Sequence, residues 1–277
     1  MRYKKLLLNV LRQMSISCLW ISQIWLAWLK QHRFSGSTIP SSIHSVEAVV
    51  VLTWDTRRES ALHLLINNAG VMCVPYEETK DGFEMQLAVN YVGHFLLTRL
   101  MLPILVTTSK SAHEGEVRIV NVSSDGHGKL APKEGIVFSD PNLKRYSVWT
   151  RYGHSKLANV LHANELAKRY GEIMSISLHP GTVKTNLSKG PLLSTPLYRL
   201  IKPIVELGAP GPRKGATNIL FAAVSTSLDI KSHNGAYLLP GGKVSEPSNT
   251  AKDPRMAFNL WEWTEKELKA RGIVFNK

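Results

Sequence analysis

Short apolar runs, several rich in β-branched residues, alternate along this chain with longer segments of helical periodicity. The runs with strand character are residues 46–54, 62–66, 116–122, 174–178 and 236–239. The segments with apolar residues at helical spacing are residues 79–105, 152–170, 215–223 and 257–271. This alternation predicts an α/β fold, in which a parallel sheet is covered by helices on both faces.

Composition is typical of a globular protein with a basic surface. Hydrophobic residues make up 44% and charged residues 20% of the 277 residues. The 34 Lys and Arg against 21 Asp and Glu give a formal net charge of +13. No run of five basic residues and no nucleic-acid motif accompanies this charge, so we expect no nucleic-acid partner.

The cysteines and histidines indicate no metal centre. Cys18 and Cys73 cannot build a disulfide framework, and the ten histidines are dispersed rather than set at zinc-ligand spacing. We therefore expect a reducing compartment, on the cytoplasmic side of any membrane, and no bound metal.

Residues 1–47 differ in character from the rest of the chain. Residues 14–29 carry no charge, include three tryptophans and have basic residues on both sides. This run is shorter than the roughly 20 apolar residues that a membrane span needs. Three interpretations are open: a membrane anchor or interfacial helix within residues 1–30, a helix packed on the domain, or a non-native start from a shifted gene boundary. Residues 48–277 are expected to form one domain.

A tyrosine and a lysine stand four residues apart at the start of the second helical segment. Tyr152 and Lys156 lie on the same face of such a helix, so the ammonium group is expected beside the phenol. A nearby positive charge favours the phenolate, and we therefore expect the pKa of Tyr152 to fall below its ordinary value. A phenol tuned in this way can exchange a proton with an alcohol or a carbonyl near neutral pH.

Five motifs occur in an order and at a spacing that resemble the short-chain dehydrogenase/reductase family, and specifically its retinol-dehydrogenase-like branch. They are NNAG at residues 67–70, VNYVGHF around Asn90, RIVNVSS at residues 118–124, YGHSK at residues 152–156 and HPGTVKT at residues 179–185. The resemblance covers about residues 62–277. It implies a Rossmann-type doubly wound parallel sheet.

The resemblance also implies roles for the matching residues. Tyr152 is the expected general acid/base, Lys156 would lower its pKa and bind the nicotinamide ribose, and Ser124 would stabilise charge on the reacting oxygen. Asn90 would anchor a water that links Lys156 to solvent. The residues expected to hold the cofactor are Asn67, Asn68, Ala69, Gly70, Tyr152, Lys156, Pro180, Gly181, Val183 and Thr185.

The glycine-rich turn with which the family begins cannot be placed in this chain. Gly36 is the only glycine before Gly70, so no TGxxxGxG sequence precedes the first motif. Residues 46–58 fit either the family's second strand followed by Arg57-Arg58, which would favour NADP, or its third strand with Asp55 on the adenine side. In either case the first βα units of the cofactor-binding half are incomplete.

The resemblance is compatible with two functions. One is an NADP-dependent oxidoreductase, with NAD less favoured, that interconverts a hydroxyl and a carbonyl on a hydrophobic small molecule. The long loop at residues 126–150, between the Ser124 and Tyr152 motifs, favours a bulky apolar substrate. The other is a catalytically impaired relative or truncated gene product that acts as a binding or scaffold protein. The resemblance further implies a homodimer that pairs through the helices at residues 79–105 and 152–170, in a soluble or membrane-associated protein.

Overall fold

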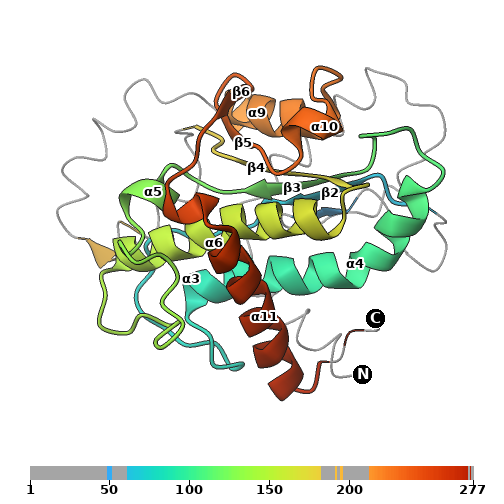
Figure 1. The fold of residues 1–277 in the computed structure, drawn as a ribbon. Coiled ribbons are helices and arrows are strands. Elements are labelled where there is room, and N and C mark those ends of the chain that lie inside the picture. Colours follow the sequence, from blue (N-terminus) through green and yellow to red (C-terminus); the bar gives the residue numbers. More distant parts are fainter. Residues whose placement is uncertain are drawn as a thin grey trace, which may run out of the picture.

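The computed structural model describes residues 49–51, 61–181, 191, 194–195, 212–273 and 275, and these residues form a six-stranded sheet with helices on both faces (Figure 1). The strands follow one another across the sheet in chain order. They are β1 (Val49–Val51), β2 (Leu64–Asn67), β3 (Arg118–Val122), β4 (Met174–Leu178), β5 (Tyr237–Leu239) and β6 (Lys243–Ser245). The arrangement is the Rossmann-type doubly wound α/β fold that the sequence predicts.

The two edges of the sheet depart from the all-parallel prediction. β2 to β5 run parallel, whereas β1 pairs antiparallel with β2 and β6 pairs antiparallel with β5. Residues 52–63 connect β1 to β2, and this length is at the lower limit of the roughly 12 residues that a parallel crossover needs. An antiparallel pairing of β1 with β2 therefore needs a shorter connection than a parallel pairing would. β6 was not expected from the sequence.

Side chains of the central strands alternate between two hydrophobic clusters. Leu64 and Ile66 of β2 face the cluster on the side of α9 (Pro212–Val224), while Leu65 faces the opposite cluster. β3 repeats this pattern, because Val120 lies in the first cluster and Ile119 in the second. Successive side chains of a strand point to opposite faces, so a sheet covered on both sides needs apolar residues at nearly every position.

One long helix of the second cluster contains a wide turn. It starts with α3 (Met85–Leu87), continues through the π-helical segment η1 (Ala88–Val92) and ends as α4 (Gly93–Ser109). Glu84 caps its start, since the Glu84 carboxylate accepts a hydrogen bond from the Leu87 amide. The helix therefore begins later than the predicted residue 79, and it continues past the exposed Pro103 to Ser109.

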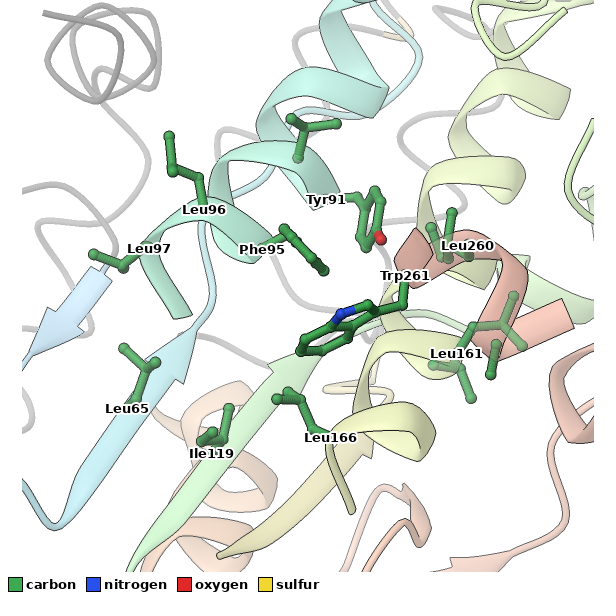
Figure 2. Close-up of a cluster of buried hydrophobic side chains, with 14 of the residues drawn as sticks. Leu65, Tyr91, Phe95, Leu96, Leu97, Ile119, Leu161, Leu166, Leu260 and Trp261 are labelled. Atoms are coloured by element: carbon green, nitrogen blue, oxygen red, sulfur yellow. The ribbon is translucent and has the colours of Figure 1, made fainter. Parts of the chain in front are cut away.

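The helix α6 (Val148–Arg169) lies between the sheet and the C-terminal helix α11 (Pro254–Ala270), as Figure 1 shows. Trp261 of α11 is 2% exposed, and its ring lies 4.8 Å from that of Phe95 (Figure 2). Two ion pairs fasten α11 to its neighbours, Arg99–Glu265 at 2.9 Å on α4 and Arg169–Glu262 at 2.8 Å on α6. α11 thus covers the outer face of α4 and α6.

Several segments that were predicted as one element are divided or lie outside the described residues. The loop at residues 126–150 contains the short helix α5 (Gly126–Lys129) and the start of α6. The short elements near the C-terminus are α10 (Ile230–His233) and η3 (Thr250–Lys252). The candidate membrane segment at residues 1–30 lies outside the described residues, as do Asp55 and Arg57-Arg58.

Within the described residues, Met85–Ser109 is long and apolar enough to cross a membrane. Buried residues make up 67% of that window, because the helix packs on the sheet beneath α11. Its apolar character is therefore explained by its place in the hydrophobic core.

Candidate functional site

The candidate site lies where the parallel strands β2, β3 and β4 end. The register aligns Asn67, the last residue of β2, with Asn121 of β3. Neighbouring strands of the same direction therefore finish at one edge of the sheet, where open α/β sheets bind their ligands. The segments that leave this edge are residues 68–70, 123–125 and 179–181.

Ser124 and Tyr152 reach this edge from two different elements. Ser124 follows β3, and Tyr152 lies in the first turns of α6, which starts because the Ser147 side chain accepts a hydrogen bond from the Thr150 amide. Both side chains border Gly126, where an added Cβ would lie 3.3 Å from the Tyr152 ring and 3.4 Å from Ser124 Oγ, and the Ser124 side chain favours the charged form of the Tyr152 phenol. Ser124 Oγ donates a hydrogen bond to Asp125 Oδ1 at 3.2 Å, and Tyr152 is 5% exposed.

Lys156 lies one turn further along α6 and is 4% exposed. Its Nζ atom lies 5.8 Å from the centre of the Tyr152 ring and donates a 3.0 Å hydrogen bond to the carbonyl oxygen of Val122. Asn159 Nδ2 donates to the same carbonyl, also at 3.0 Å. Ser123 Oγ in turn donates to the Lys156 carbonyl at 2.7 Å. Three hydrogen bonds thus fix α6 to the end of β3 at the place where Lys156 stands.

Burial reverses the expected pKa shift of Tyr152. The sequence predicted that Lys156 would lower this pKa, but burial raises it above the ordinary value of a phenol, although the Ser124 side chain opposes the change. Burial also lowers the pKa of Lys156 to about 8. The correction has one physical reason. The desolvation of both groups, which a sequence does not reveal, outweighs their mutual attraction.

Asn90 lies within the wide turn η1 and is fully buried. Its Oδ1 accepts a hydrogen bond from the Val71 amide at 2.8 Å, and its Nδ2 donates to the Val71 carbonyl at 3.0 Å and to Ser155 Oγ at 2.8 Å. The side chain therefore joins the segment after β2 to α6. Wide turns of this kind are frequent at functional sites.

Two glycines allow the close approach of α5 and α6. A Cβ atom on Gly153 would lie 2.3 Å from the Ala131 amide nitrogen and 2.5 Å from the Leu130 carbonyl carbon. A Cβ atom on Gly126 would lie 3.3 Å from the Tyr152 ring and 3.4 Å from Ser124 Oγ. The absence of side chains at both positions therefore lets α6 lie close to α5 and to the residues that follow it.

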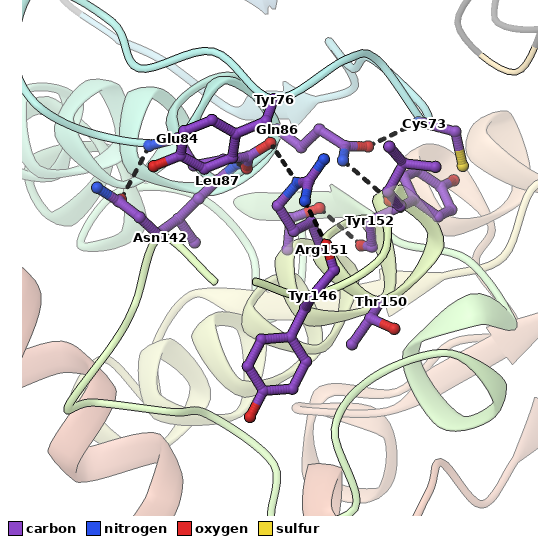
Figure 3. Close-up of polar contacts among 12 residues, drawn as sticks. Cys73, Tyr76, Glu84, Gln86, Leu87, Asn142, Tyr146, Thr150, Arg151 and Tyr152 are labelled. Atoms are coloured by element: carbon purple, nitrogen blue, oxygen red, sulfur yellow. Dashed lines mark hydrogen bonds and ion pairs between the residues drawn. The ribbon is translucent and has the colours of Figure 1, made fainter. Parts of the chain in front are cut away.

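A buried ion pair adjoins Tyr152 on the other side. Arg151 Nε lies 3.4 Å from Glu84 Oε1, and these side chains are 4% and 2% exposed (Figure 3). The Arg151 guanidinium also donates to the Tyr146 carbonyl and lies 5.2 Å from the centre of the Tyr76 ring. The pair therefore ties the loop before α6 to the start of α3, one residue from Tyr152.

The residues expected to hold the cofactor, other than the two on α6, fall into three groups: one braces the sheet, five follow β2 or β4 at the site, and two lie outside the described residues. Asn67 points into the fold, where its Nδ2 donates to Thr98 Oγ1 at 3.0 Å and to Asn121 Oδ1 at 2.9 Å, so this side chain braces the sheet. Asn68, Ala69 and Gly70 follow β2, and Pro180 and Gly181 follow β4, all at the edge that carries Ser124. Gly181 has a φ of +90°, which favours glycine. Val183 and Thr185 lie outside the described residues.

Sequence reasoning missed four residues that build this site. Ser155 and Asn159 flank Lys156 on α6, Gly153 precedes them, and His127 of α5 binds the Ser124 carbonyl. A signal for the first two was present, since two polar residues one helical turn apart lie between the apolar residues Leu157, Ala158 and Val160, which indicates buried hydrogen bonds. Nothing in the sequence indicated the close approach at Gly153.

A comparison with known families agrees with this geometry. The family model for short chain dehydrogenases matches residues 43–191, which is more than half of the chain. The chain belongs to the short-chain dehydrogenase/reductase family. Its place is in the retinol-dehydrogenase-like branch, and the family is one of oxidoreductases.

Curated relatives and a solved structure support the assignment. The chain is 40% identical over 228 residues to the short-chain dehydrogenase/reductase drtF of Aspergillus calidoustus, covering 78% of this chain and 71% of the relative. It is 41% identical over 208 residues to human retinol dehydrogenase 12, covering 73% of this chain and 60% of the relative. A crystal structure of an uncharacterised protein from Mycobacterium paratuberculosis matches with a TM-score of 0.56 and 31% identity, over 80% of this chain and 71% of that one.

The aligned region is shorter than most of these relatives. It spans 71% of the Aspergillus protein, 60% of the human one and 54% of an uncharacterised oxidoreductase from Schizosaccharomyces pombe. The chain therefore spans between about half and seven tenths of the curated relatives it matches.

Proposed function

We propose that this chain is a nicotinamide-dependent oxidoreductase that interconverts a hydroxyl and a carbonyl group on a hydrophobic small molecule. The observation that carries the proposal is that the Ser124 and Tyr152 side chains meet at Gly126, beside the buried ammonium of Lys156, at the carboxyl edge of the sheet. These groups serve proton transfer to or from an oxygen atom.

Each side chain has a distinct part in the proposed reaction. The Tyr152 hydroxyl gives its proton to the substrate carbonyl oxygen, while Ser124 Oγ donates a hydrogen bond to the same oxygen and holds it in place. Lys156 stabilises the phenolate that remains. Burial raises the pKa of Tyr152, so the phenol keeps its proton at neutral pH and is set to act as an acid, which favours reduction of a carbonyl.

The described residues fit the nicotinamide end of a dinucleotide. A Cβ atom on Gly70 would lie 3.3 Å from Asn90 Oδ1 and 3.5 Å from Lys156 Nζ, so glycine leaves open a space bordered by the ammonium group. Within the described residues, the hydrogen bond of Lys156 Nζ goes to Val122, which leaves donors for a ribose. When bound, a nicotinamide supplies the hydride. NADP is the form we propose, from Arg57-Arg58 in the sequence.

Asn90 contributes to the proton path through its backbone. Its side chain already makes three hydrogen bonds within the described residues, to both backbone groups of Val71 and to Ser155. A water that links Lys156 to solvent would therefore bind the Asn90 carbonyl oxygen rather than the side-chain amide.

Steady-state kinetics with NADPH and a panel of apolar aldehydes and ketones test the proposal. Tyr152→Phe removes the hydroxyl that donates the proton, and we expect it to lower kcat by about 100-fold or more. Tyr146→Phe is the matched control, because that ring is 38% exposed, and it should leave kcat unchanged. Equal turnover by the two variants would contradict the assignment of Tyr152.

A second candidate function is that of a binding or scaffold protein without catalysis. The observation that favours it is the absence of a glycine-rich turn from the sequence before Gly70. Two lost charge-assisted hydrogen bonds to the phosphates, at about 1.5–3 kcal/mol each, would weaken cofactor binding by about 100-fold or more. Fluorescence titrations with NADPH and NADH discriminate the two candidates: saturable binding supports the oxidoreductase, and no binding supports the scaffold.

Location and partners follow from the same proposal. The substrate is a small molecule, and residues 1–30 are the segment we propose for membrane association. Deletion of residues 1–34 should move the protein into the soluble fraction of a cell lysate. An unchanged distribution would argue against an anchor.

A further inference from the structure

His127 connects the Ser124 backbone to a distant segment of the chain. It lies in α5, three residues after Ser124, and is 5% exposed. Its Nδ1 lies 2.7 Å from the Ser124 carbonyl oxygen, and its Nε2 lies 3.1 Å from the Ser248 amide nitrogen. The ring also packs edge-on against Tyr237 of β5, with the centroids 4.8 Å apart. Every polar atom of this imidazole thus has a partner.

The two partners fix which nitrogen carries the proton. The Ser248 amide can only donate, so Nε2 must offer a lone pair, and the Ser124 carbonyl can only accept, so Nδ1 must carry the hydrogen. A neutral ring protonated on Nδ1 satisfies both contacts. An imidazolium satisfies only the contact with the Ser124 carbonyl, because it would place a second N–H group against the Ser248 amide.

Ser248 is itself held in place by hydrogen bonds of its own segment and by close packing on α5. Its Oγ accepts a hydrogen bond from the Ala251 amide at 3.3 Å and lies 3.1 Å from Thr250 Oγ1. Asn164 of α6 donates to the Ala251 carbonyl at 2.8 Å. The Ser248 Cβ lies 3.1 Å from the place where a Cβ of Gly128 would stand, so the segment also packs closely on α5.

We propose that His127, as a neutral ring with its hydrogen on Nδ1, is a positioning residue that links the Ser124 backbone to the Ser248 backbone. Gain of a second proton by this ring breaks the contact with Ser248. Ser124 Oγ keeps its place near the Tyr152 side chain only while the link is intact. The inference deepens the proposed oxidoreductase function and rests on it.

The charged and titratable groups around the ring agree with a neutral imidazole near pH 7. Burial lowers the pKa of His127 below its ordinary value, while the Ser124 carbonyl and Asp125 oppose the change. Among the described residues, His179 after β4 interacts with the ring and Tyr237 on β5 packs edge-on against it, while Lys129 on the same short helix pairs with Asp125. Because this pKa is lowered, the link is complete above about pH 6.5 and is lost as the pH falls below that value.

Two variants of His127 separate its two contacts. In His127→Asn the amide nitrogen replaces Nδ1 and keeps the bond to the Ser124 carbonyl, whereas His127→Phe keeps the ring and loses both hydrogen bonds. His113→Asn, at an exposed histidine, is the control. With NADPH and a carbonyl substrate, we expect His127→Phe and His127→Asn, which both lose the Ser248 contact, to lower kcat by about tenfold with KM little changed, and His113→Asn to match the parent chain. An unaltered kcat in His127→Phe would overturn the positioning role.

A readout without turnover keeps this test separate from that of the proposed function. Nitrogen NMR of the histidine rings in the full chain reports the tautomer, and hydrogen exchange reports protection of the Ser248 amide. We expect a proton on Nδ1 at pH 7.5 and a lower protection factor for the Ser248 amide in both His127 variants. In the parent chain, this protection factor should fall once the pH is below the value at which the NMR signals show that the His127 ring gains its second proton. A proton on Nε2, or equal protection factors at Ser248 in all four chains and on both sides of that titration, would overturn the proposal even if no carbonyl is reduced.

Discussion

The Nζ atom of Lys156 donates a hydrogen bond to the carbonyl oxygen of Val122, at 3.0 Å, in a place where no carboxylate of the described residues pairs with it. An ammonium group buried in this way is costly, and the cost is visible in a pKa that burial lowers from 10.5 to about 8. The lysine that we propose for catalysis is therefore held at the expense of stability.

Lys156→Met should make the fold more stable while it abolishes turnover. We expect a gain of about 2 kcal/mol in the free energy of unfolding at pH 7, which is the pKa penalty less the lost hydrogen bond. Urea denaturation of both chains measures it. Because the folded pKa lies below the unfolded one, the parent chain gains stability as the pH rises from about 8 to 10.5, and the variant lacks this slope. Lys231→Met, at an exposed lysine, should change neither quantity.

Carbonyl reduction should decline above about pH 8. Tyr152 keeps its proton there, since burial raises its pKa, but Lys156 loses its charge and no longer stabilises the phenolate. The profile of kcat between pH 6 and 10 checks this. In Lys156→Arg the guanidinium stays charged, so the remaining activity should decline at a higher pH. A decline at the same pH in both chains would assign it to another group.

Gly153→Ala should destabilise the protein, because the added methyl group would lie 2.3 Å from the Ala131 amide nitrogen. Overpacking of this kind costs about 1–3 kcal/mol, and here it would also push Tyr152 away from Ser124. Gly171→Ala is the control, since no atom lies within 4 Å of its added Cβ. Thermal unfolding should show a lower Tm for the first variant alone. Equal Tm values would mean that the segment after α5 moves aside without loss of stability.

The protein should not dimerise through α4 and α6, the face expected from family resemblance. α11 covers that face, with Trp261 2% exposed and with ion pairs to Arg99 and Arg169. Light scattering after gel filtration, combined with cross-linking, should show no dimer that is joined through α4 and α6. A particle of twice the mass of the chain, with cross-links that map to α4 and α6, would contradict this expectation.

The central strands and the order of the site segments could be predicted because they follow from local patterns. Residues 174–178 were predicted as a strand with the bounds that the structure has, and the described residues of the five motifs lie in segments that meet at one edge of the sheet. β6 was missed although Gly241-Gly242 stands before it, and both glycines have positive φ. A glycine pair between two short runs is a hairpin signal, so this strand was within reach of the sequence.

Other features depend on three-dimensional contacts that no local pattern reports. The pKa of Tyr152 is set by how many atoms surround it, and the close approach at Gly153 depends on the path of the loop after α5. The role of His127 requires Ser248, which lies far along the chain. Asn159 and Ser155 were visible as polar residues, but their partners were not.

The wide turn η1 lets the helix hold one extra residue while α4 continues almost in phase with α3. Ala88–Val92 uses hydrogen bonds five residues apart in place of the four of a regular helix, and from this turn Asn90 reaches Val71 while Tyr91 and Phe95 belong to the cluster beneath α11. Deletion of a single residue here would restore a regular helix and leave α4 facing nearly the same way. The extra residue therefore serves the site and not the packing of α4, and its loss would cost the link between α6 and the segment after β2.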